Sequence, residues 1–77
     1  MSIVPMLRAA TIVRALQKAG FHIVRQKGSH VHLKLFSDPT RYATVPHHAK
    51  DISRKTLASI LRQARLSVGE FLNLLEK

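Results

Sequence analysis

One short block holds the side chains best suited to chemistry, with the sequence RQKGSHVH at residues 25–32. Histidine can move protons near neutral pH because its ordinary pKa is about 6.5, and Lys27 or Arg25 can stabilise charge that develops on a phosphate. Gly28 lets the backbone approach a phosphate closely, and Ser29 can donate a hydrogen bond. RNA can be cleaved without a metal when its own 2′-OH attacks the phosphate and such groups are present. On the residues alone, the block allows two interpretations: metal-independent RNA cleavage in which His30 moves the proton, or an inert histidine on the surface of a strand.

Other histidines allow further interpretations. His32 shares a predicted strand face with His30, and we expect it to flank the catalytic residue and contact RNA. These two histidines, with the pair His47-His48, could also chelate zinc. However, no carboxylate or cysteine lies nearby in the sequence to complete a metal shell, so we expect no metal and no cofactor. One residue of the pair is expected to pack against the next helix and fix the loop by hydrogen bonds, and a direct RNA or catalytic role is the alternative. Neither the pair nor His32 adjoins the turn at Gly28.

The net charge of the chain indicates a polyanionic partner. Thirteen Lys and Arg residues stand against four Asp and Glu residues, which gives a net charge of +9 and an isoelectric point near 11.4. Such a field attracts nucleic acid at long range, and an acidic protein partner is compatible with it. A membrane surface is disfavoured because the basic residues are not gathered on one long amphipathic helix. The charge therefore favours nucleic acid as the partner, and we expect RNA to bind through Arg25, Lys27, Gly28, Ser29, His32 and Lys34.

Two kinds of residue are scarce. Aromatic residues make up 5% of the chain, and only Phe21, Phe36, Tyr42 and Phe71 are available to stack on bases. We therefore expect phosphate contacts to dominate RNA binding and the affinity to fall steeply with salt. Cysteine is absent, which excludes disulfides, thiolate metal sites and cysteine nucleophiles.

The apolar pattern predicts the elements that position the block. Residues 8–19 form a helix that Gly20 ends. Strands follow over residues 21–26, 29–36 and 41–45, with a turn at residues 27–28 and a loop at residues 37–40. Pro46 stops the third strand.

Two more helices follow the strands. A loop over residues 47–54 leads into a helix whose inner face carries Leu57, Ile60, Leu61 and Ala64. Ser67 and Glu70 then have the spacing of a capping box, which starts a last helix.

These elements predict an α+β fold in the order α-β-β-β-α-α, as one domain over residues 1–77. Short turns make the sheet a three-stranded antiparallel meander with its helices on one face. The polar residues of the second strand, His30, His32 and Lys34, then project from an open face. No apolar run approaches the roughly 18 residues needed to span a membrane, and the start of the chain lacks signal-peptide features. We therefore expect a cytoplasmic protein.

Four blocks, in this order and at this spacing, resemble the HicA toxin family. They are residues 20–21 (GF), 25–30 (RQKGSH), 45–48 (VPHH) and 56–64 (TLASILRQA). HicA proteins are toxins of type II toxin–antitoxin modules. The resemblance implies a double-stranded-RNA-binding-domain-like fold, ribosome-independent mRNA cleavage and inhibition by a HicB-type antitoxin. It also implies that His30 is the catalytic histidine and that His48 matches the family histidine after Val-Pro.

Four residues, at three places in the chain, depart from the family pattern. Arg8-Ala9 replaces a frequent Ser-Gly pair before the first helix, Lys55 replaces a Gly before the second, and Arg65 replaces a Gly at the end of the second. These differences affect the geometry of the loops and leave the Gly-Ser-His block unchanged.

Two other functions are compatible with the same charge and fold. A non-catalytic RNA-binding module predicts RNA binding with no cleavage. A DNA-binding or interaction protein that uses the basic helices predicts a preference for duplex DNA over single-stranded RNA. The sequence leaves the cleavage specificity and the oligomeric state open.

Overall fold

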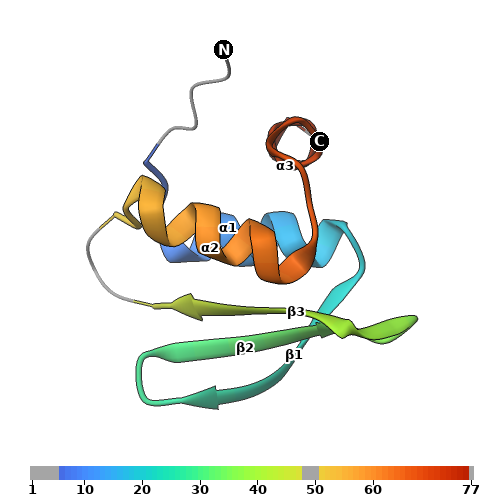
Figure 1. Ribbon diagram of the computed structural model, residues 1–77. Helices are drawn as coiled ribbons and strands as arrows, with labels where there is room; N and C mark the ends of the chain where they lie inside the picture. Colours follow the sequence, from blue (N-terminus) through green and yellow to red (C-terminus); the bar gives the residue numbers. More distant parts are fainter. Residues whose placement is uncertain (1–5, 48–50, 77) are drawn as a thin grey trace.

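Residues 6–47 and 51–76, which are those that the computed structural model describes, form one helix, three strands and two further helices. The elements are α1 (Ala9–Lys18), β1 (Phe21–Lys27), β2 (His30–Leu35), β3 (Asp38–Pro46), α2 (Arg54–Ala64) and α3 (Val68–Leu75). The strands pair antiparallel in the order β1-β2-β3, and Figure 1 shows the helices on one side of the sheet. The predicted α+β order, which is that of a double-stranded-RNA-binding-domain-like fold, is confirmed.

The core fills the space between the helices and the sheet. Each helix buries an apolar stripe, and alternate residues of β2 and β3 face it; the largest of these side chains are Ile12, Leu16, Leu33, Val45, Leu57, Ile60 and Phe71. Full burial of one such side chain stabilises the fold by about 1.5–3 kcal/mol. From β1 only Phe21 is buried, and Ile23 stays 47% exposed. Beyond Phe21, β1 therefore lies outside the cover of the helices.

The helix ends follow from local side-chain chemistry. No side chain caps α1 at Arg8. Ser53 caps α2 by accepting a hydrogen bond from the Thr56 backbone N–H at 3.2 Å. The capping box of α3 is confirmed, because the Ser67 hydroxyl accepts from the Glu70 N–H at 3.0 Å and the Glu70 carboxylate accepts from the Ser67 N–H at 2.9 Å. A cap of this kind is worth about 1 kcal/mol.

Left-handed backbone ends α2 at Arg65, where the HicA pattern often has glycine. Arg65 has φ +56° and ψ +42°, a conformation that costs a non-glycine residue roughly 1–2 kcal/mol. Its guanidinium lies 3.9 Å from the Asp38 carboxylate. The substitution keeps the turn of the chain and adds a charge contact at the start of β3.

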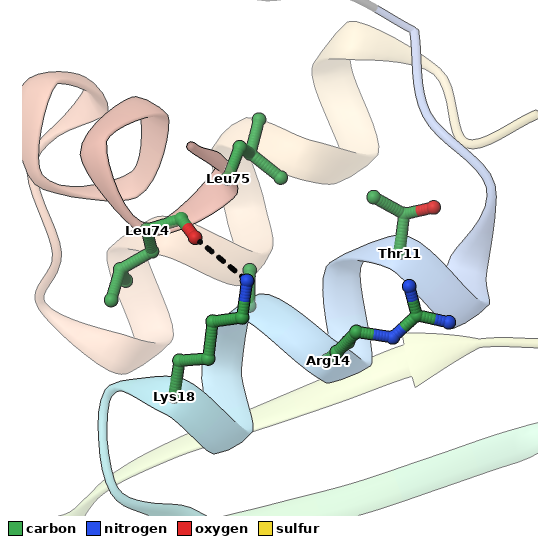
Figure 2. A pocket seen from close by; sticks show the side chains of 6 residues that line it. Thr11, Arg14, Lys18, Leu74 and Leu75 are labelled. Carbon is green, nitrogen blue, oxygen red and sulfur yellow. Dashed lines mark hydrogen bonds between the residues drawn. The ribbon is translucent and has the colours of Figure 1, made fainter. Parts of the chain in front are cut away.

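The last helix is held against the first at its carboxyl end. Figure 2 shows the Lys18 ammonium pointing to the backbone carbonyl of Leu74, 3.4 Å away. Carbonyls in the last turn of a helix have no partner within the helix, so a lysine there satisfies one of them. The small hollow beside this bond, of about 60 Å³, is also lined by Thr11 and Arg14.

The third strand is longer than the sequence predicts. It begins at Asp38, so the predicted loop over residues 37–40 is wrong and the turn occupies only residues 36–37. The pairing of β2 with β3 is irregular here. Lys34 pairs with Tyr42 and the next residue, Leu35, pairs with Asp38, so residues 39–41 of β3 form a bulge. Thr40 closes the intervening bulge by donating to the Asp38 carboxylate from its hydroxyl at 2.6 Å and from its N–H at 3.3 Å.

Among the described residues, no helix has the length and apolar character required to cross a membrane.

Candidate active site and nucleic-acid interface

The sheet face that points away from the helices carries three cross-strand rows of side chains. We call these nine residues the open face: Lys27, His30 and Pro46 in the first row, Arg25, His32 and Thr44 in the second, and His22, Lys34 and Tyr42 in the third. Residues directly opposite each other on neighbouring strands share a face, with Cβ atoms about 4.5–5.5 Å apart. The alternate residues Val31 and Leu33 are buried. The predicted orientation of β2 is therefore confirmed.

A bulge in β1 brings two predicted RNA-binding residues onto the open face. Ile23 pairs with Leu33 and Arg25 pairs with His32, so Val24 is an extra residue without a partner in the ladder. In an unbroken strand, residues 21, 23, 25 and 27 would all share one face. The bulge divides them, because Phe21 and Ile23 stay on the helix side while Arg25 and Lys27 turn to the open face.

The first row lies at the β1–β2 turn. Lys27 and His30 are cross-strand partners on either side of a turn of two residues, Gly28 and Ser29. Lys27 is therefore the last residue of β1, not part of the turn. Gly28 has φ +58° and Ser29 does not have positive φ, which is the pattern of a type II′ turn. A Cβ on Gly28 would meet no atom within 4 Å, so the turn is open to a ligand.

The second row is tied to the helix layer. The Thr44 hydroxyl and His32 Nδ1 form a hydrogen bond of 3.3 Å. The backbone N–H of Thr44 donates in turn to the Gln63 side chain of α2 at 3.1 Å. His32 is half-buried, whereas His30 is exposed. The arrangement fixes His32 in place and leaves His30 at the accessible end of the strand.

His47 adjoins the turn, contrary to the prediction. Its backbone N–H donates to the carbonyl of Ser29, which extends the β2–β3 ladder one residue past Pro46, and its side chain is exposed. The prediction that neither histidine of the His47-His48 pair adjoins this turn is therefore wrong for His47. His48 lies outside the described residues. The position of His47 depends on the register of β2 on β3, which the sequence does not show. Because Pro46 pairs with His30, the next residue, His47, lies opposite Ser29.

None of the four acidic residues belongs to the open face. Asp51 pairs with Arg8 at 4.0 Å, Asp38 pairs with Arg65, Glu70 belongs to the α3 capping box, and Glu76 is the C-cap residue of α3. The hydrogen bond from the Thr40 hydroxyl lowers the pKa of the Asp38 carboxyl, and that from the Ser67 backbone lowers the pKa of Glu70.

The open face itself carries the cations Arg25, Lys27 and Lys34 and no acid. Within residues 6–47 and 51–76, no three histidine or acidic side chains come together as a metal site would require.

The aromatic residues divide between the core and the surface. Phe21 and Phe71 are buried, so the prediction that they are available to stack on bases is wrong. Phe36 and Tyr42 are exposed. Sequence reasoning did not single out His22, whose imidazole stacks on the Phe36 ring. Only the register, which places His22 opposite Lys34, identifies it as part of the open face.

Comparison with known families matches residues 9–66 to the model described as HicA toxin of bacterial toxin–antitoxin. No curated protein matches the chain. The matched range contains all three rows of the open face and the whole sheet. The chain belongs to the HicA toxin family, and it is a toxin of a toxin–antitoxin system.

Proposed function

We propose that this toxin is an endoribonuclease that cleaves mRNA without a metal, with His30 as the catalytic residue. The observation that supports it best is the cross-strand pairing of His30 with Lys27 at the exposed end of the open face. A proton acceptor and a cation then lie side by side at a tight turn whose backbone a phosphate can approach. Residues 1–77 act as one toxin domain in this proposal, and its mRNA substrate places it in the cytoplasm.

The proposed reaction is an internal transfer. His30 takes the proton from the 2′-OH, the 2′ oxygen bonds to the phosphorus, and the bond from phosphorus to the 5′ oxygen breaks. A second group or a water molecule gives a proton to the leaving 5′ oxygen. The products are a 2′,3′-cyclic phosphate and a 5′-OH. Lys27 stabilises the charge on the phosphate oxygens, and Ser29 donates a hydrogen bond to them.

The remaining predicted site residues bind the RNA strand. Arg25 and Lys34 contact phosphates in the second and third rows, and His32 contacts the strand beside His30. Such contacts are independent of base sequence, because they involve the backbone of the nucleic acid. Three cations along one face would thus hold a single strand across the active site.

The antitoxin partner of this toxin is proposed to be of the HicB type and to cover the open face. Carboxylates on the antitoxin would face Arg25, Lys27 and Lys34, since complementary charge speeds association. Neutralisation would then be steric, because RNA could not reach His30. A complex in which RNA still reaches His30 would contradict this part of the proposal.

The chemistry is tested with end-labelled RNA and the purified protein. We expect the same cleavage in the presence of EDTA as in its absence, and products that carry a 2′,3′-cyclic phosphate and a 5′-OH. A single 2′-deoxy nucleotide at the cleaved position should block the reaction there, while neighbouring deoxy substitutions should not. Loss of cleavage with EDTA, or products with a 5′-phosphate, would exclude this mechanism. RNA binding without any cleavage would instead identify a non-catalytic RNA-binding module.

A further inference from the structure

The third row of the open face ends in exposed aromatic rings. The His22 imidazole stacks on the Phe36 ring, with 4.5 Å between the ring centroids and 10° between the ring planes. Phe36 keeps 63% of its surface exposed, and Tyr42 in the same row keeps 44%. Phe36 is the most exposed of the large apolar side chains among the described residues, and it is the one that stacks on a neighbouring ring.

The surroundings of these rings define what they can bind. Lys34 lies between His22 and Tyr42 in the cross-strand row. No acidic residue occurs on the open face, and the second row adds Arg25. Flat rings combined with cations along one groove or face are the chemistry that binds single-stranded nucleic acid, in which bases stack on aromatic side chains and phosphates contact lysine and arginine.

The position of the rings fits the path of a strand that is cleaved at His30. Along β2, the third row lies about 13 Å from His30, at about 3.3 Å per residue. Both sites are on the same face, and the second row with Arg25 lies between them. A strand that follows the rows thus meets the stacking rings, then cations, then the proposed catalytic residue.

We propose that His22, Phe36 and Tyr42 form a base-stacking subsite that holds an unpaired base of the RNA substrate, with Lys34 on the adjacent phosphate. The inference rests on the proposed function and specifies where its substrate lies. Because a base in a duplex has both of its faces covered, the subsite selects single-stranded RNA. The turn of β2 into β3 thereby becomes part of the substrate site.

The test measures binding of a single-stranded RNA that contains 2-aminopurine to the non-cleaving variant His30→Ala. Adding Phe36→Ala should weaken binding about fivefold or more and remove most of the 2-aminopurine quenching. The same loss of affinity should occur at low and high salt, because stacking carries no charge. Phe36→Tyr should restore binding. Ile23→Ala is the matched control, since this side chain is 47% exposed on the opposite face of the same hairpin.

If Phe36→Ala bound and quenched the RNA as its His30→Ala parent does, the inference would be overturned. Weaker binding of that variant to the antitoxin would not rescue it, because the inference concerns RNA. The outcome is separate from the proposed function. If the wild type cleaves RNA while Phe36→Ala binds normally, only the stacking subsite fails. If His30→Ala neither binds nor quenches the RNA and the wild type does not cleave, both fail.

Discussion

The role proposed for Lys27 depends on its cross-strand partner, His30. Its ammonium is brought to the open face beside His30 by a turn of two residues. A hydrogen bond that involves a charged group is worth about 1.5–3 kcal/mol, and each 1.4 kcal/mol changes a rate about tenfold. In the proposed mechanism, one such contact from Lys27 to the phosphate is therefore large enough to change the rate of cleavage as well as the affinity for RNA.

We predict that Lys27→Ala slows single-turnover RNA cleavage by about 10- to 100-fold at saturating protein. Lys27→Arg should keep most of the rate, because the charge remains. The control is Lys55→Ala, an exposed lysine on α2 in the helix layer, which should cleave as the wild type does. Lys27→Ala with an unchanged rate would show that this ammonium does not act on the phosphate.

The residue types of the site could be predicted from the sequence, whereas their partners could not. Alternation along residues 29–36 places His30 and Lys34 on the open side, which the burial of Val31 and Leu33 confirms. The contact of His47 with Ser29 and the stacking of His22 on Phe36 both depend on strand register. Register is set by turn geometry as well as by the apolar pattern, and both turns lie at other residues than the sequence predicts, at 28–29 and 36–37.

At the scale of elements, irregular pairing explains what sequence patterns missed. The sequence pattern does not indicate the bulge at Val24, because the β-branched and long side chains around it are compatible with either face of the sheet. The sequence predicts a loop where the bulge after Asp38 lies, because Pro39 and Thr40 are typical of turns. By contrast, the α3 start was predictable, since the capping box of Ser67 and Glu70 is local.

The capping box of α3 makes stability depend on pH. Its hydrogen bonds lower the pKa of Glu70 in the folded state, so the ionised form stabilises the fold above the ordinary Glu pKa. That contribution is lost as the pH falls through the lowered folded-state value. Asp38 behaves in the same way, because Thr40 lowers its pKa.

We therefore predict that the melting temperature falls as the pH is lowered from 7 to 3, and that it falls less in Glu70→Gln. Glutamine keeps the geometry of the capping box and loses only the charge. Adding Asp38→Asn should flatten the profile further. Circular dichroism melts across this pH range provide the measurement. A Glu70→Gln profile parallel to that of the wild type would contradict the assigned role of Glu70.

For the whole molecule, a net charge of +9 and the absence of acids from the open face act together. In the proposed function, the charge of the whole chain attracts RNA, and the three cations of the open face determine where it binds. The number of contacts between cations and phosphates can be obtained from the dependence of affinity on salt. Each neutralised phosphate of a single strand contributes about 0.7 to the slope of log K against log salt.

We predict a steep salt dependence of RNA binding, with the slope reduced by about 0.7 in each of Arg25→Ala, Lys27→Ala and Lys34→Ala. The non-cleaving His30→Ala protein serves as the parent, and Lys55→Ala in the same parent is the control. Filter binding at four or five salt concentrations gives the slopes. Equal slopes in all of these variants would place the RNA elsewhere on the molecule.

The measurement that tests the central claim most directly is single-turnover cleavage of one labelled RNA in EDTA by the wild type and by His30→Ala. We expect the substitution to slow cleavage by about 100-fold or more, the usual contribution of a positioned acid or base. RNA affinity and melting temperature should stay near the wild-type values, because the His30 side chain is exposed at the end of β2. Cleavage by His30→Ala at the wild-type rate would contradict the account.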